Sequence, residues 1–188
     1  MRKIVVASLL ALSMMASQAR EIAGITLPEQ IVREADNAAL VLNGAGIRKK
    51  FFVKVYLASL YLGQATSDIA EVLNVDGPAR VQMQIIHSEI EKEKLVAAWN
   101  DGFSANLDAE KLQAVRDRLD QFNAMFQTMR EGDLIDLDYI PGKGTHVTIN
   151  GMEKGVIPGV DFYQALLLVW LGDSPISKSL KKELLGSG

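Results

Sequence analysis

The sequence predicts an α+β protein in which helices cover one antiparallel sheet. Apolar segments of strand length, rich in β-branched and aromatic residues, occur at 38–48, 51–63 and 80–87, and again within 133–157. Two segments with helical spacing of apolar residues separate these groups, and two more follow the last strand. Strands joined by tight turns pair with their neighbours, so this order of strands, helices, strands and helices favours a meander over a parallel sheet.

The first nineteen residues have the three parts of a secretory signal peptide. Two basic residues precede the apolar segment Ile4–Met15, and Ser17-Gln18-Ala19 has the small-x-small pattern of a cleavage site. The apolar segment is too short for a permanent membrane anchor. We therefore expect cleavage after Ala19, a mature chain of one domain at 20–188 with no stable membrane insertion, and export to the periplasm or medium.

Composition excludes several classes of function. The chain has 20 basic and 23 acidic residues, and removal of two lysines and arginines with the signal peptide leaves 18 against 23, a formal charge of −5. Nucleic-acid binding needs a basic surface and is not expected. The chain has no cysteine, which excludes disulfides, thiolate catalysis and cysteine-ligated metals.

The N-terminal half is predicted to contain mostly strands. Glu21–Val32 indicates a strand, a turn and a second strand, with Pro28 at a sheet edge. The next two strands are central and flank the basic residues at 48–50. Ser67 is expected to cap a short helix that ends at Leu73. Arg80–His87 alternates with an inward apolar face, Val81, Met83 and Ile85.

The middle of the chain is predicted to form two helices. Ser88 and Glu91 have the spacing of a capping box, which places the start of the first helix at Ser88. Asp108 is expected to cap the second helix. The predicted apolar faces are Leu95, Ala98, Trp99 and Phe103 on the first helix, and Leu112, Val115, Leu119, Phe122, Phe126 and Met129 on the second.

The C-terminal part is predicted to contain three more strands and two helices. Asp133–Ile140 alternates, and Asp136 and Asp138 are interpreted as outward, solvated positions. Asn150-Gly151 predicts a type I′ hairpin. Val160–Leu171 is predicted to be a helix, which is buried because its run Ala165–Leu171 is apolar on all sides, and a helix at Ser177–Leu185 closes the fold.

Familiar catalytic and cofactor motifs are incomplete. Gly44-x-Gly46 lacks the third glycine of a dinucleotide site, and the residues after it resemble a strand. His87 and His146 are the only histidines, and neither has a partner at metal-ligand spacing, so no metal site is predicted. Either histidine suits a structural role, and either could be an axial ligand of a haem.

Arg48 and Tyr56 are the candidate site residues. If they lie on neighbouring strands, a guanidinium and a phenol can converge on one small anion, because arginine offers two parallel donors to a carboxylate. The alternative from the local sequence is a surface arginine and a tyrosine at the edge of the core.

Several segments resemble the chalcone isomerase family. That family has a Gly-Ala-Gly-x-Arg segment, a following strand and a C-terminal helix pair, and the resemblance covers nearly all of the mature chain. It implies an open-faced β-sandwich, an antiparallel sheet covered by helices, with a ligand cleft between them. The matching segments are Gly44-Ala45-Gly46-Ile47-Arg48, Phe52-Val53-Lys54-Val55-Tyr56, Leu60-Tyr61-Leu62, Trp170-Leu171-Gly172-Asp173 and Leu184-Leu185-Gly186.

The resemblance is incomplete at the positions that isomerases use. Arg48 matches the family's arginine and Lys94 can be laid over its lysine, whereas Tyr56 stands in the place of its threonine. Glu91 and Ala98 stand where the family has tyrosine and asparagine. The late threonine–methionine pair falls on Val169-Trp170.

These matches give three functional hypotheses. The first is a non-catalytic carrier of a fatty acid or similar small amphipathic carboxylate, as in the plant plastid branch that keeps arginine and tyrosine. Arg48 and Tyr56 would hold the carboxylate, and the tail would lie along Trp99, Phe103, Phe122 and Phe126. The second is an isomerase or lyase with a non-flavonoid substrate, using Arg48 as electrophile and Lys94 or Tyr56 for proton transfer. The third is a haem protein using His87, His146 or a tyrosine, as the haem-binding fungal relatives suggest.

Overall fold

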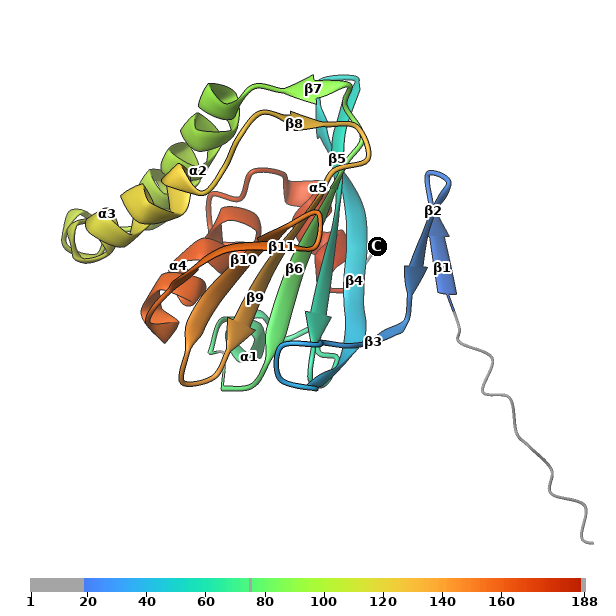
Figure 1. The fold of residues 1–188 in the computed structure, drawn as a ribbon, viewed down its shortest axis with the longest axis horizontal. Coiled ribbons are helices and arrows are strands. Elements are labelled where there is room, and N and C mark those ends of the chain that lie inside the picture. Colours follow the sequence, from blue (N-terminus) through green and yellow to red (C-terminus); the bar gives the residue numbers. More distant parts are fainter. Residues whose placement is uncertain (1–18, 75, 187–188) are drawn as a thin grey trace, which may run out of the picture.

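The computed structural model describes residues 19–74 and 76–186 (Figure 1). Residues 1–18 of the predicted signal peptide lie outside the described residues. The main sheet has seven strands, all antiparallel to their neighbours, in the order β11-β10-β9-β6-β5-β4-β3. The strands are β3 (Gln30–Val32), β4 (Ala39–Lys50), β5 (Val53–Leu62), β6 (Ala79–Ile85), β9 (Leu134–Ile140), β10 (Gly144–Ile149) and β11 (Met152–Ile157).

Helices cover one face of this curved sheet (Figure 1). None of the helices in the described residues is both long and apolar enough to cross a membrane. The arrangement of strands and helices confirms the predicted α+β class and the open-faced sandwich. The helices are α1 (Ile69–Leu73), α2 (Lys92–Asn106), α3 (Ala109–Ala124), α4 (Val160–Leu171) and α5 (Lys178–Leu184).

The main core lies between the sheet and these helices. The predicted inward face of β6 is correct, since Val81, Met83 and Ile85 are buried there. Helix α4 is buried along almost its whole length, including Trp170, as its apolar run Ala165–Leu171 predicts. Apolar burial of this kind is the main favourable term in folding, so the α4–sheet contact is central to stability.

A smaller apolar cluster lies on the opposite face of the sheet. The hairpin of β1 (Ala19–Ile22) and β2 (Ile25–Pro28) contributes Leu27, which packs with residues of β4 and β5. The Tyr61 hydroxyl donates a hydrogen bond of 3.1 Å to the carbonyl oxygen of Pro28. The predicted strand, turn and strand in 21–32 is therefore present, with a third short strand, β3, at the sheet edge.

The interpretation of Asp136 and Asp138 as solvated residues was wrong. They point to the face away from the helices, but they are only 8% and 4% exposed. Arg80 binds Asp138 through two hydrogen bonds of 2.8 Å, and Arg33, itself buried, also contacts Asp138 at 3.3 Å. Alternation correctly gave the face, but the segment after β3 brings Arg33 over it, a contact that no local pattern reveals.

One predicted helix start was also wrong. Glu89 and Ile90 form strand β7, which pairs with β8 (Met129–Arg130), so Ser88 cannot cap a helix. Helix α2 begins at Lys92, after Glu91, whose side chain makes no capping hydrogen bond.

Three further helix predictions are resolved by the structure. Asp68, not Ser67, caps α1 by accepting a hydrogen bond from the backbone of Ala70. Asp108 caps α3 as predicted, but the helix ends at Ala124, before the last two residues of the predicted stripe, Phe126 and Met129. Those two side chains are buried all the same.

The hairpin predicted at Asn150-Gly151 is present. It joins β10 to β11, and both residues have the positive φ that a type I′ turn requires, 51° and 76°.

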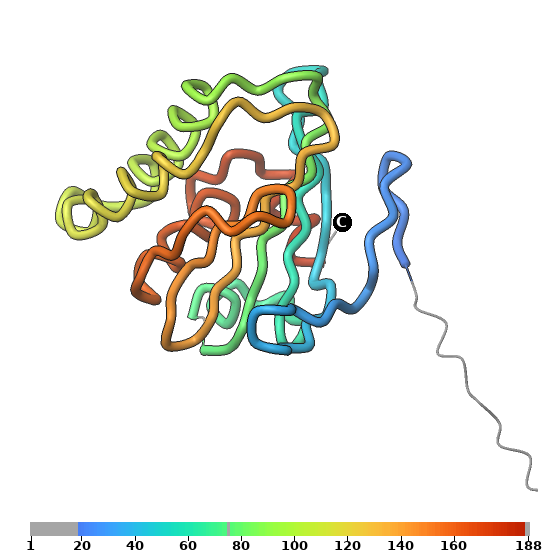
Figure 2. The backbone as a smooth tube through the Cα atoms, viewed as in Figure 1, coloured from blue at the N-terminus to red at the C-terminus, as the bar shows by residue number. Residues whose placement is uncertain are grey.

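Glycines in β4 allow the last helix to pack directly on the sheet. Figure 2 shows the C-terminal helix beside β4, and a Cβ atom at Gly44 would overlap the carbonyl oxygens of Glu183 and Leu184. Asn43, next to a bulge in β4, donates a hydrogen bond of 2.8 Å to the same Leu184 carbonyl. Gly44 is therefore needed for close approach of backbones, not for a cofactor.

We expect Gly44→Ala to lower the free energy of unfolding by about 1–3 kcal/mol, because α5 must shift to admit a methyl group. Urea unfolding followed by tryptophan fluorescence measures this. Gly63→Ala is the matched control, since no atom lies within 4 Å of its added Cβ. Equal midpoints for the two variants would contradict the role of Gly44.

Asp36 should make a pH-dependent contribution to stability. Hydrogen bonds from Arg33, the largest cause, lower the pKa of the Asp36 carboxyl from 3.8 to about 2. Because the pKa is lower in the folded state, the ionised carboxylate stabilises the fold at pH values above the unfolded-state pKa of 3.8. This contribution is lost as the pH falls from 3.8 toward about 2. Asp36→Asn should therefore cost about 1 kcal/mol at pH 7, and this cost should shrink between pH 4 and pH 2. Urea titrations at several pH values, with the exposed Asp117→Asn as control, test this; a cost that does not change with pH would contradict it.

Candidate ligand-binding site

A cavity of about 650 Å³ lies between the end of the β4–β5 hairpin and helix α2. This volume is in the range of sites that hold small molecules. Helix α2 forms one wall with small side chains, Ala98, Gly102 and Ala105, spaced so that they share one helical face. The other lining residues are Arg48, Lys50, Phe51, Val53, Val55, Tyr56, His87, Glu89, Ile90, Lys94, Leu95, Asp101, Ser174 and Ile176.

Arg48 and Tyr56 lie directly opposite each other in the β4–β5 pairing. Side chains at such positions emerge on the same face, with Cβ atoms about 5 Å apart. Both residues line the cavity. The neighbouring-strand arrangement on which an anion site depends is therefore present.

The Tyr56 hydroxyl is fixed by the core. Tyr56 is 5% exposed, and its oxygen accepts a hydrogen bond of 3.0 Å from the indole nitrogen of Trp170 in α4. Burial raises the pKa of Tyr56 to about 12, although the Trp170 hydrogen bond and the charge of Arg48 act in the opposite direction. The hydroxyl is thus protonated at neutral pH. Its proton has no acceptor among the described residues, so the O–H can be donated to a ligand.

The Arg48 guanidinium is also available. It is half-buried, and within the described part of the chain it makes no side-chain hydrogen bond or ion pair. A partly desolvated guanidinium with unused donors is well suited to bind a carboxylate. Arg48 and Tyr56 together can supply three hydrogen bonds to one anion.

Other charged residues lie toward the rim of the cavity. The Lys94 side chain is 71% exposed and pairs with Glu91 at 3.1 Å. Glu89 pairs with Arg130 at 3.2 Å. Lys94 therefore shares the cavity with Arg48 and Tyr56, as the overlay on the isomerases suggests, but its ammonium is solvated and already has an acidic neighbour.

The structure places the four aromatic residues that were expected to line the tail site in the core. Trp99 packs against Phe122, Phe126 and Trp170 with ring centroids 5.5–5.6 Å apart, and Phe103 packs against Phe162. None of the four lines the cavity. Trp99 and Phe103 lie on the face of α2 that meets the rest of the core, with Phe122 of α3 and Phe126 just after it, whereas the small residues of α2 face the cavity. The helical spacing of Ala98, Gly102 and Ala105 is the sequence signal that could have identified this wall.

The two histidines lie at opposite ends of the sheet. His87 follows the C-terminal end of β6 and lines the cavity. His146 in β10 pairs in register with Asp138, which in turn pairs with Arg80 near the start of β6. Only His87 could present a nitrogen to a ligand in this cavity. The described residues contain no group of three or more potential metal ligands.

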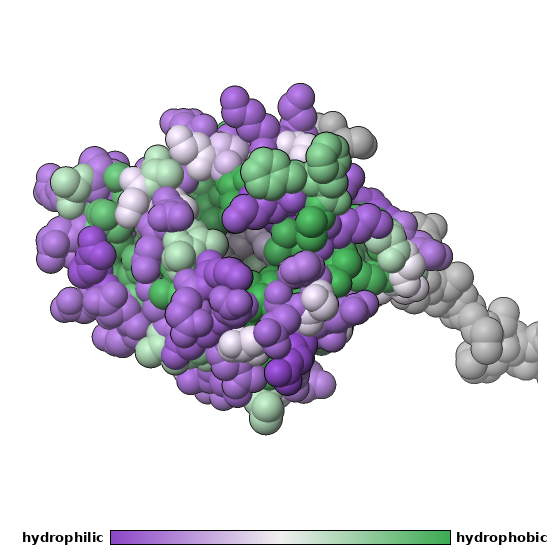
Figure 3. All heavy atoms as spheres, turned by 90° about the horizontal axis from the view of Figure 1, so that it is seen from above, coloured by the Kyte–Doolittle hydropathy of each residue, from purple (hydrophilic) through white to green (hydrophobic). Residues whose placement is uncertain are grey.

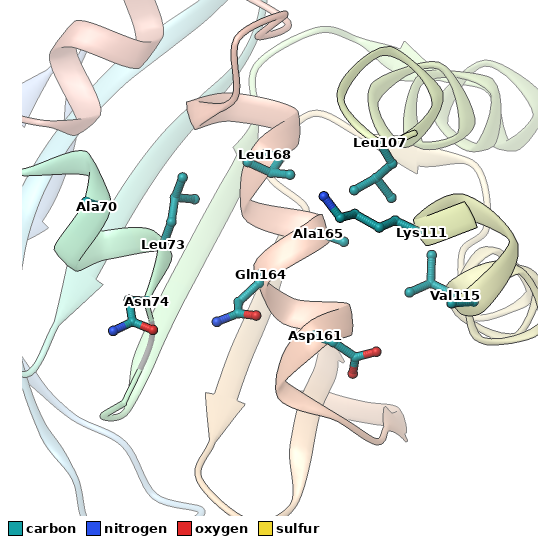
Figure 4. A pocket seen from close by; sticks show the side chains of 11 residues that line it. Ala70, Leu73, Asn74, Leu107, Lys111, Val115, Asp161, Gln164, Ala165 and Leu168 are labelled. Carbon is teal, nitrogen blue, oxygen red and sulfur yellow. The ribbon is translucent and has the colours of Figure 1, made fainter. Parts of the chain in front are cut away.

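A second cavity, of about 520 Å³, lies between α1, α3 and α4 (Figure 4). Its two charged residues, Lys111 and Asp161, already have partners. Lys111 pairs with Asp108 at 3.2 Å, and Asp161 accepts hydrogen bonds from both terminal nitrogens of Arg118. A third cavity, of about 470 Å³ near Leu62–Ala79, has only acidic charged residues, Glu71 and Asp76. Of these three cavities, the one at Arg48 is the only one with an unpaired cation.

Comparisons with known proteins agree with this fold. The sequence model of the chalcone isomerase-like family matches residues 19–186. The structure is similar to that of a fatty-acid binding protein of Arabidopsis thaliana, with a TM-score of 0.62 and 16% sequence identity, over 84% of this chain and 96% of that chain. At this identity the similarity concerns the fold. No curated protein matches the sequence. The family match spans the whole described fold, and the chain belongs to the chalcone isomerase-like family.

Proposed function

We propose that this protein is an exported, non-catalytic carrier of a fatty acid or a similar small amphipathic carboxylate. The observation that supports this best is the pair of unused donors, the Arg48 guanidinium and the Tyr56 hydroxyl, side by side in a cavity with apolar walls. A ligand with an anionic head and an apolar tail satisfies both parts of such a site. The fold of a fatty-acid binding protein in the plant neighbour is consistent with this proposal.

Binding explains the site better than proton transfer does. A general base works best when its pKa is near the operating pH, whereas the pKa of Tyr56 is raised to about 12. Lys94 is mostly exposed and paired with Glu91. The two groups that an isomerase or lyase would use for proton transfer are therefore poorly arranged for it, while Arg48 and Tyr56 are well arranged as donors.

Arg48→Met should weaken binding of dodecanoate about 10- to 100-fold, because charge-assisted hydrogen bonds are lost from a partly desolvated site. Tyr56→Phe should have a smaller effect, about 3- to 10-fold, since one neutral donor is lost. Isothermal titration calorimetry measures both affinities. The matched control is Arg116→Met, which removes an exposed arginine of α3 that lies outside the cavity.

Dodecanoate binding that is equal in the wild type and in Arg48→Met would contradict the proposal. Titration of the wild-type protein with haem tests the alternative hypothesis of a haem protein. A Soret band that shifts in His87→Ala and not in His146→Ala would favour a haem site in this cavity, since only His87 lines it.

Export is tested separately. Expression of residues 1–188 in a Gram-negative host should yield a periplasmic protein whose intact mass corresponds to residues 20–188, because signal peptidase cuts after the small residue of Ser17-Gln18-Ala19. Ala19→Pro should block this cleavage. Full-length protein in the cytoplasm would contradict export.

A further inference from the structure

The turn between β4 and β5 presents two aromatic side chains to solvent. Lys50 pairs with Val53, so Phe51 and Phe52 alone form the turn. Phe51 is 89% exposed and Phe52 is 100% exposed. Two adjacent phenylalanines gain nothing for folding in this position, since neither is removed from water.

The turn is also conformationally unfavourable. Phe51 has a φ of +56°, and Phe52 does not share the positive φ. In two-residue hairpin turns, a central position with positive φ is normally occupied by glycine, asparagine or aspartate. A bulky residue with positive φ is strained, and such strain is concentrated at functional sites.

Basic residues surround the turn. Arg48, Lys49, Lys50 and Lys54 lie within seven residues that contain no acid. Lys49 and Lys54 are directly opposite each other across the hairpin and are both exposed. Like charges in this arrangement repel each other, so the hairpin carries a second feature that is unfavourable for the isolated fold. A protein with an excess of acidic residues thus has one strongly basic, aromatic tip.

The tip is continuous with the cavity. Phe51, Lys50 and Val53 all line it. The hairpin ends at the top of Figure 1, close to β7, and Figure 3 looks onto this end of the molecule. There hydrophobic residues border a hollow, with hydrophilic residues around them (Figure 3). A surface that contacted the tip would therefore also meet the cavity opening.

We infer that the β4–β5 tip is an interfacial anchor that docks the cavity opening onto an anionic lipid bilayer. Aromatic side chains insert at the headgroup level, and lysines and arginines around them are attracted to anionic headgroups. The repulsion between Lys49 and Lys54 is relieved when anions lie between them. Docking itself does not depend on the proposed ligand, but it would let a lipid-derived acid pass between bilayer and cavity.

Co-sedimentation with vesicles tests the inference. Residues 19–188 are used, because every contact described above lies within them and the apolar segment at 4–15 would bind lipid by itself. The wild type should bind vesicles of 70% phosphatidylcholine and 30% phosphatidylglycerol at least tenfold more tightly than vesicles of phosphatidylcholine alone. Sodium chloride at 0.5 M should abolish this difference, because it screens the exposed charges.

Two sets of variants separate the aromatic and electrostatic parts. Phe51→Gly with Phe52→Ser should lower the partition coefficient for anionic vesicles at least tenfold, while the urea midpoint stays equal or rises because the strained φ is relieved. Lys49→Gln with Lys54→Gln should lower it about tenfold and leave dodecanoate affinity unchanged, since neither lysine lines the cavity. The matched control is Val32→Ser with Met152→Ser, two exposed apolar residues distant from the tip in sequence, which should bind vesicles as the wild type does.

Wild-type protein that does not prefer anionic vesicles would overturn the inference. Either hairpin variant, the phenylalanine pair or the lysine pair, would also overturn it by binding these vesicles as tightly as the wild type does. A third contrary result is a wild-type protein that does not bind vesicles but dimerises with increasing concentration, with dimerisation lost in either hairpin variant; this would assign the tip to a protein contact. Vesicle binding is measured without dodecanoate and dodecanoate binding without vesicles, so failure of the carrier proposal and failure of docking are distinguishable.

Discussion

The antiparallel pairing of β4 with β5 positions the candidate site, the exposed tip and the contact with α5. Its register places Arg48 opposite Tyr56, and its bulges at Asn43 and after Arg48 adjust which side chains face the helices. Gly44 in the same strand lets α5 approach the sheet closely. Because side chains alternate between faces, a shift of one residue in this register would move Tyr56 away from the cavity. One hairpin thus positions the donors of the site, the exposed tip and the face on which α5 packs.

The site combines a rigid donor with an adaptable one. The Trp170 hydrogen bond holds the Tyr56 oxygen from the core side, which leaves the tyrosine proton directed to other acceptors. Arg48 has no such support and can adjust to the ligand. The cavity exists because α2 has small residues on the face toward it, while the large residues of the same helix fill the core. Binding capacity and core packing therefore come from two faces of one helix.

The β4–β5 tip combines several features that are unfavourable for the fold. The far face of the sheet matches its charges closely, since Arg33 and Arg80 pair with the carboxylates of Asp36, Asp136 and Asp138. The β4–β5 tip does the opposite, with exposed phenylalanines, a positive φ and two opposed lysines. Strain that the fold does not need is evidence for a function outside the fold.

The class of fold, most of the strands and helices, and the pair Arg48 and Tyr56 could be predicted from the amino-acid sequence. These depend on local periodicity, turn chemistry and a short motif, as the Asn150-Gly151 hairpin and the alternation of β6 show. Tertiary structure decided the burial of Asp136 and Asp138, the β7–β8 pairing that displaced the expected capping box, and the wall of the cavity. The physical reason is the same in each case: these features depend on contacts between segments far apart in the chain. A periodic pattern shows which face a side chain occupies, but only the folded chain shows what covers that face.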